Sequence, residues 1–183
     1  MKKLGIVFMT LLAMAFTVSC TKQGPQGPQG PAGQDGNANV VSSTVTIHDY
    51  DWQWNRMFTD GDNNERGQYY VTIDYPAINN NVFNYGAVLV YMSVQGTWSQ
   101  VPLTYYYYVT DDGQVLFYEA SIEVATLSDG GVRLFWTESD YWNVCPDTHD
   151  FKVVAIEASV YSNRSDVDYS NYEAVKTAFQ LAD

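Results

Sequence analysis

Positive charge, cysteine and long apolar runs are all scarce in this sequence. Nine Lys and Arg residues stand against 21 Asp and Glu residues, a formal net charge of −12. No basic patch is present to attract nucleic acid or a bare anionic bilayer, so we expect neither as a partner. Two cysteines are too few for a disulfide framework. The longest apolar run, Leu4–Val18, has 15 residues and falls short of the roughly 20 that a membrane-spanning helix needs.

Apolar and aromatic residues, in contrast, are plentiful. Hydrophobic residues make up 46% of the 183 and aromatic residues 15%. This composition is enough to bury a core, which excludes a wholly disordered protein.

The first 20 residues are organised like a secretory signal. Two lysines precede the apolar run, as an n-region precedes an h-region. The run ends in Thr17-Val18-Ser19-Cys20, which resembles the lipobox of bacterial lipoproteins. That resemblance implies removal of residues 1–19 as a signal peptide and attachment of diacylglycerol to the thiol of Cys20. Ordinary cleavage after Ala13-Met14-Ala15 is the alternative.

A glycine-rich segment follows the cysteine. Glycine recurs at every third position from Gly24 to Gly36, and proline follows three of these glycines, which is the collagen period. Because the triplets are few and no hydroxyproline is evident, an extended spacer is favoured over trimerisation through a triple helix. Its 15 residues would span roughly 45 Å as polyproline II. We assign residues 20–39 to the lipidated cysteine and this collagen-like spacer.

Residues 40–183 form the third region, where period-2 alternation predicts a single all-β domain. Strands are expected at 41–48, 69–75, 86–94, 104–110, 114–126, 132–137 and 151–161. Asp111-Asp112-Gly113 and Ser128-Asp129-Gly130-Gly131 are turn signals between β-rich runs. Roughly eight antiparallel strands joined by short turns favour a β-sandwich.

A short helix is expected at the C-terminal end of this domain. Ser170 followed by Glu173 fits a capping box, and apolar residues follow at helical spacing. The pattern predicts a helix from Asn171 to about Gln180 that packs on the sheet or its edge. Residues 76–84, with three successive asparagines, are expected to form a loop or a single turn.

The order of these segments resembles a class of bacterial lipoprotein. After the lipobox and the Gly-Pro triplets come five characteristic stretches: Gly36–Val40, Tyr85–Tyr91, Trp98–Leu103, Phe151–Ile156 and Asp168–Tyr172. Along nearly its whole length the chain is similar to the collagen-like-repeat lipoproteins of Gram-negative bacteria. The resemblance implies a location and an architecture, and it carries no catalytic residue because that family has no established activity.

Several polar clusters are candidates for catalytic or metal-binding sites. Cys145 lies close in sequence to His149, but a structural, partly buried cysteine is the favoured interpretation. The cluster Asp147, His149 and Asp150, and the cluster His48, Asp49 and Asp51, could each bind a divalent metal, but a metal site usually needs three or four converging ligands, so solvated turns are the favoured interpretation. Asp60–Glu65 matches the first, third and fifth positions of an EF-hand loop but lacks its glycine and final glutamate, so calcium binding there stays open. We expect no catalytic residue, no metal and no cofactor.

The aromatic residues are the more informative excess. In a strand, Tyr105 to Tyr108 would place two rings on each face, and Trp52 and Trp54 would share a face about 7 Å apart. The candidates for stacking on a sugar or a peptide are Trp52, Trp54, Tyr105 and Tyr107. Packing of the same rings in the core is the alternative.

Together these patterns predict a lipid-anchored protein of the cell envelope, held in the outer membrane and facing the periplasm or the cell exterior. Its β-domain is expected to be non-catalytic, with a structural or binding role. The alternative is a carbohydrate- or protein-binding module that uses exposed Tyr and Trp. An envelope hydrolase is less favoured because no motif with a mechanism is present.

Overall fold

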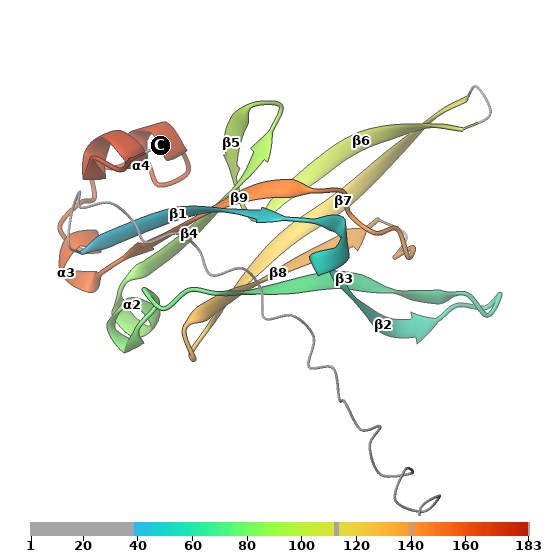
Figure 1. Ribbon diagram of the computed structural model, residues 1–183, viewed down its shortest axis with the longest axis horizontal. Helices are drawn as coiled ribbons and strands as arrows, with labels where there is room; N and C mark the ends of the chain where they lie inside the picture. The colour runs from blue at the N-terminus through green and yellow to red at the C-terminus, as the bar shows by residue number, and fades with distance from the viewer. Residues whose placement is uncertain (1–38, 112–113, 140, 183) are drawn as a thin grey trace, which may run out of the picture.

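The computed structural model describes residues 39–111, 114–139 and 141–182 (Figure 1). The expected signal peptide, Cys20, the spacer and the Asp112-Gly113 turn lie outside these residues. The strands are β1 (Val40–Ile47), β2 (Gln53–Thr59), β3 (Glu65–Asp74), β4 (Ala87–Val94), β5 (Thr97–Gln100), β6 (Leu103–Asp111), β7 (Gln114–Leu127), β8 (Gly131–Glu138) and β9 (His149–Ile156). The helical segments are η2 (Asp49–Asp51), α2 (Asn80–Tyr85), α3 (Ala158–Tyr161) and α4 (Tyr172–Phe179). No helix in the described ranges is long and apolar enough to cross a membrane.

The strands form two antiparallel sheets that face one another. One sheet has four strands in the order β1-β9-β4-β5, and the other has five in the order β2-β3-β8-β7-β6. This arrangement confirms the predicted β-sandwich with a short C-terminal helix. The described strands number nine, and the two that the expected ranges omit, β2 and β5, both lie at sheet edges.

The main core lies between the sheets. Val90 and Met92 of β4 and Phe151 of β9 project from the four-stranded sheet and meet Ile122 and Leu134 of the five-stranded sheet, all fully buried. Burial of these alternate positions follows from the period of a strand, in which every second side chain points to the same face.

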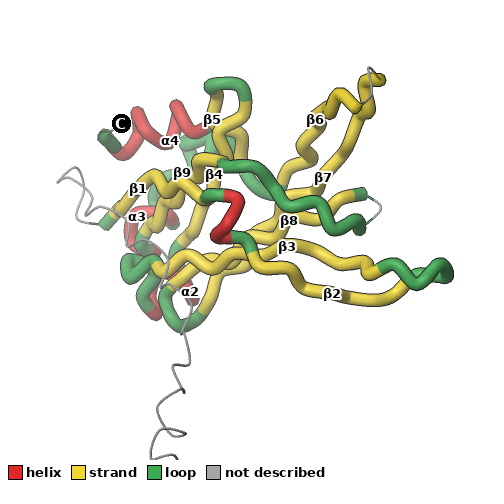
Figure 2. Tube along the Cα trace, turned by 45° about the vertical axis from the view of Figure 1, so that its right-hand side comes forward, coloured by secondary structure: helices red, strands yellow, loops and turns green. Residues whose placement is uncertain are grey.

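A second apolar layer covers the opposite face of the four-stranded sheet. There α4 packs Val175 and Phe179 against Leu89 and Val154, which point away from the main core. The described residues therefore form three layers, with α4 on one sheet, and none of their helices covers the outer face of the other sheet (Figures 1 and 2).

A buried lysine lies beneath α4. The Nζ atom of Lys152 donates to the hydroxyl of Tyr172 at 2.9 Å. It also lies over the rings of Trp98 and Tyr172, at 4.8 and 4.3 Å from their centroids. These aromatic faces replace part of the hydration that the cation gives up, so the first turn of α4 is held to β9 and β5 through one side chain.

The last predicted strand is shorter than expected. Strand β9 ends at Ile156, and residues 158–161 form α3 instead. Ile156 pairs with Val40 on one side and Ala87 on the other, and these are the terminal residues of β1 and β4. Beyond Ile156 no described strand continues alongside the backbone. The Glu157 N–H donates to the Asn39 carbonyl, and the groups that follow form helical bonds such as Tyr161 N–H to the Glu157 carbonyl.

The predicted cap of the C-terminal helix is displaced by one residue. Asn171 caps α4, and its side chain accepts from the amides of Glu173 and Ala174. The Ser170 hydroxyl instead donates to Asp168 at 2.6 Å. Within 76–84, where a loop or a single turn was expected, the short helix α2 begins after Asn79, whose side chain caps it.

Two leucines give a matched test of where the core ends. Leu134 is fully buried between the sheets, whereas Leu116 is exposed near the tip of the β6–β7 hairpin. We expect Leu134→Ala to lower the free energy of unfolding by about 2–5 kcal/mol, because it removes buried apolar volume, and Leu116→Ala to lower it by less than about 1 kcal/mol. Urea denaturation followed by tryptophan fluorescence measures both, and equal losses would contradict the assigned core.

Candidate functional site

The hairpin of β6 and β7 extends beyond the rest of the molecule (Figure 1). Strand β7 pairs with β8 only through residues 120–127, whereas its pairing with β6 continues outward to Gln114. We call residues 106–111 and 114–119 the β6–β7 arm. Over this length the sheet has two strands, and on its outer face no third strand or second sheet of the described residues supports the exposed side chains.

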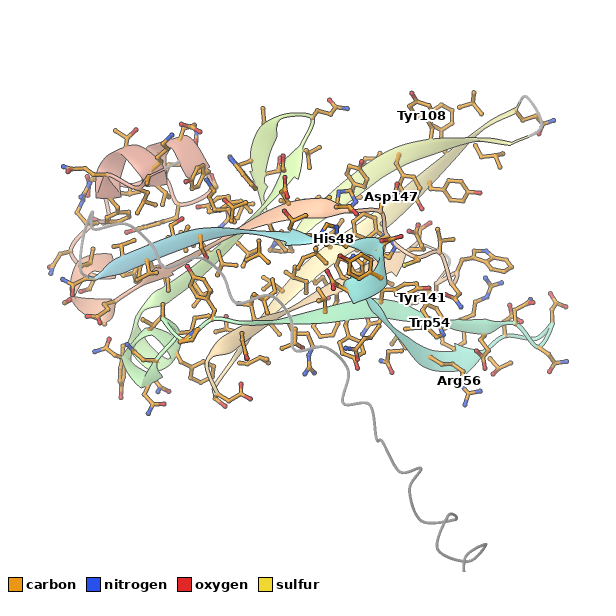
Figure 3. The ribbon with its side chains drawn as sticks, in the orientation of Figure 1. His48, Trp54, Arg56, Tyr108, Tyr141 and Asp147 are labelled. Atoms are coloured by element: carbon orange, nitrogen blue, oxygen red, sulfur yellow. The ribbon has the colours of Figure 1, made fainter. Side chains whose placement is uncertain are left out.

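Exposed rings line the outer face of this arm. Tyr106, Tyr108 and Phe117 are 71%, 68% and 81% exposed. Tyr108 lies opposite Phe117, with 6.5 Å between ring centroids, and Tyr106 lies opposite Glu119. We call these four side chains the arm platform. Neighbours on it are about 5 Å apart across the strands and about 7 Å apart along them, and Figure 3 shows Tyr108 standing away from the space between the sheets.

The predicted stacking residues occupy other positions. Tyr105 and Tyr107 point to the inner face of β6, where they are half-buried against the main core. Trp52 is only 6% exposed, with its ring against Trp136 and Phe151, and it precedes β2. It is therefore not available for stacking on a ligand, and it shares no strand face with Trp54. Trp54 is half-buried, 5.0 Å from the ring of Tyr69.

The sequence-based candidates did not include the arm platform, because they took the inward pair of tyrosines, Tyr105 and Tyr107, rather than the outward pair. The alternation of Tyr105 to Tyr108 separates two pairs of rings but does not say which pair faces the core. The register that follows from the Asp-Gly turn places Tyr105 opposite Ala120, in phase with the buried Ile122. That signal could have identified Tyr106 and Tyr108 as the outward pair.

A buried carboxylate lies under the base of the arm. Glu138 is 3% exposed and accepts hydrogen bonds from Nε1 of Trp136 at 2.7 Å and from the hydroxyl of Tyr107 at 2.9 Å. Burial and the adjacent carboxylate raise the pKa of Tyr107. His149 stacks on Trp136 at 5.1 Å, and burial lowers the pKa of its imidazole. The cluster therefore holds a protonated phenol and a neutral imidazole near pH 7, fixed by packing.

Cys145 has the wrong electrostatics for a nucleophile. Its thiol donates to the carbonyl of Asp49 at 3.3 Å. The residue is exposed, whereas the sequence predicted partial burial. Loss of water around the sulfur, together with the Asp49 carboxylate, raises the pKa of the thiol. A nucleophilic cysteine needs the opposite shift, toward the thiolate.

The two histidines come to the same end of the molecule without forming a metal site. Strand pairing places Ile47 opposite His149, so His48 lies nearby. His48 stacks on Tyr50 at 4.9 Å. Within the described part of the chain, no three or more His, Cys, Asp and Glu side chains gather closely enough to hold a metal ion.

The acidic loop compared with an EF-hand is the turn between β2 and β3. Oδ1 of Asp60 accepts from the amides of Asp62 and Asn64, each at 2.9 Å. Oδ2 accepts from Nε of Arg66 at 2.8 Å and forms an ion pair with Nη2 at 2.7 Å. Both carboxylate oxygens of Asp60 are thus engaged by protein donors, and the loop in this form is a turn closed by arginine.

A second apolar surface surrounds this turn. The guanidinium of Arg66 lies 3.6 Å from the ring centroid of Trp142, and Phe58 contacts Tyr141 at 5.7 Å. These contacts join the β2–β3 hairpin to the segment that follows β8. The exposed members of this surface are Met57, Phe58, Tyr141, Trp142 and Val144.

Comparison with protein-family models, with curated proteins and with solved structures found no match for this chain.

The Asp60 turn makes a prediction about pH. Amide donors, led by Asn64, and the Arg66 guanidinium lower the pKa of Asp60 from 3.8 to about 2. Because the pKa is lower in the folded protein, the stabilisation is present above about pH 4 and is lost as the pH falls toward 2. NMR titration of the carboxyl carbon should give a midpoint near 2, and Arg66→Gln should move it toward 3.8. A midpoint near 3.8 in the unsubstituted protein would contradict the geometry.

Proposed function

We propose that this chain is a lipid-anchored lipoprotein of the cell envelope, seated in the outer membrane, whose β-sandwich is a non-catalytic binding domain. The lipobox before Cys20 and the collagen-like spacer support the anchor. A thioether at Cys20 with further acyl chains would exceed the two hydrophobic signals that stable anchoring requires. The proposal leaves the domain facing either the periplasm or the cell exterior.

The observation that supports a binding role is the position of the arm relative to the start of β1. Strand β1 begins at the end of the domain that bears α2, α3 and α4, and the tip of the β6–β7 arm lies at the opposite end (Figure 1). A membrane anchor that precedes Val40 would therefore leave the arm platform pointing away from the bilayer. Three exposed rings at that position, on an otherwise acidic domain, favour a surface that meets a ligand.

A neutral glycan is the ligand that the arm platform supports best. Flat tyrosine and phenylalanine faces stack on the C–H faces of sugar rings, and the Glu119 carboxylate can accept hydrogen bonds from hydroxyl groups. The net charge of −12 disfavours phosphorylated or sulfated polymers. A protein partner is the second candidate, favoured by the separate apolar surface that includes Phe58 and Trp142.

Metabolic labelling tests the anchor. Cells that express the unsubstituted chain and are fed an alkyne fatty acid should yield a labelled protein in the membrane fraction, whereas Cys20→Ala should lose the label and become soluble. Cys145→Ala is the matched control and should keep the label. Equal labelling of the wild type and Cys20→Ala would overturn the anchor.

Binding to neutral oligosaccharides tests the arm platform. On an array of neutral glycans, Phe117→Ala should weaken binding about tenfold, because it removes one stacking ring. Phe83→Ala removes an exposed phenylalanine on α2, away from the arm, and should change nothing. Absence of binding to any neutral glycan, or equal loss in both variants, would reject the glycan and leave the protein partner as the candidate.

A further inference from the structure

Strand β6 is an unprotected edge of the five-stranded sheet. The sheet order ends at β6, so the outward N–H and C=O groups of this strand have no partner strand among the described residues. From Leu103 to Thr110 the strand carries no charged residue and no proline. Its pairing with β7 is continuous, without a bulge. Charges, prolines and bulges are the devices by which proteins keep edge strands from pairing.

The other edges differ from β6. At the opposite edge of the same sheet, β2 has a bulge between Arg56 and Phe58 and carries the charge of Arg56. Strand β5 has four residues. Strand β1, an edge of the four-stranded sheet, is also uncharged, but all of its residues pair with β9 and the sheet is backed by α4. Its exposed side chains are Val41, Thr44 and Thr46. Among the described edge strands, only β6 combines exposed rings on a segment that stands clear of the domain with an edge that has neither a bulge nor, from Leu103 to Thr110, a charge.

The β6–β7 arm also has too few strands for its apolar content. An isolated two-stranded hairpin is at best marginally stable in water, and further strands are needed to support it. The arm nevertheless exposes Tyr106, Tyr108 and Phe117 on one face and Leu116 on the other. A strand added at β6 would supply backbone partners and cross-strand ring contacts that the arm lacks.

We infer that a second copy of this chain adds that strand, with β6 pairing antiparallel to β6 across a two-fold axis. Centred on Tyr107, the pairing sets Tyr106 of each copy opposite Tyr108 of the other. Asp111 of each copy is then paired with Leu103 of the other, so no two charged residues are paired across the edge. The chain is acidic overall, and the uncharged stretch from Leu103 to Thr110 is where two copies can meet without pairing like charges.

The arrangement closes on itself. Each copy uses its β6 edge once, so the contact yields a dimer and no filament. A two-fold axis perpendicular to the sheet leaves the outer faces of both arms on the same side, so two arm platforms form one continuous surface. The inference therefore goes beyond the proposed function, because the edge holds the second copy while the face remains available to a ligand.

Sedimentation velocity tests the dimer. The probe is residues 20–183 with Cys20→Ser, which keeps the chain soluble. We expect a molar mass twice that of the monomer at high concentration and dissociation on dilution. Tyr106→Glu with Tyr108→Glu places like charges opposite one another twice, and should weaken the dimer by about tenfold or more. Tyr50→Glu with Tyr85→Glu adds the same charge at equally exposed tyrosines outside the arm and should leave the dimer intact.

Each other outcome overturns the inference. A monomer at every concentration does so, as does a dimer that survives the Tyr106 and Tyr108 substitutions while circular dichroism shows a folded protein. A threefold mass that disappears on deletion of residues 24–36 would assign association to the spacer. Phe117→Ala lies on β7, away from the edge, and should leave the dimer unchanged, so loss of glycan binding and loss of the dimer are separable.

Discussion

The packing of one indole ring, that of Trp136, closes the core where the two sheets diverge. Trp136 is 3% exposed, with the edges of Trp52 and Tyr105 against it and His149 stacked on its face. These residues come from both sheets and from the segment between β1 and β2, so the contact ties the layers together. Its Nε1 is satisfied by the buried Glu138. Beyond this cluster the β2–β3 and β6–β7 hairpins of the five-stranded sheet extend as two-stranded arms.

The two sheets meet the requirement for burial in different ways. The four-stranded sheet is covered on both faces, by the main core and by α4, and even its lysine, Lys152, is enclosed by aromatic rings. The five-stranded sheet is covered on one face and outgrows its partner at the β6–β7 arm. The outer face of this arm, which no layer of the described residues covers, displays the rings of the arm platform, and this concentrates the surface suited to binding at one end of the domain.

Period-2 alternation predicted most strands because side-chain direction follows directly from extended backbone. It did not predict which face of each strand points to the core. The four tyrosines from Tyr105 to Tyr108 alternate perfectly, yet the outward pair is the one that sequence reasoning passed over. Similarly, the alternation that continues through Ala158 and Val160 ends as a helix, because neighbouring strands end beside Ile156. Both Ser170 and Asn171 can accept hydrogen bonds from helix amides; the Ser170 hydroxyl bonds to Asp168 instead, and Asn171 caps the helix.

The sequence alone determined the acidic character and the positions of most strands, and it predicts a lipoprotein-like organisation for the first 39 residues, since composition and local spacing are carried by neighbouring residues. The tertiary structure decided which rings are buried, that Trp52 is a core residue, that Asp60 is held by Arg66, and that β6 is a free edge. Each of these depends on where a partner strand or sheet ends, and that is set by segments far apart in the chain.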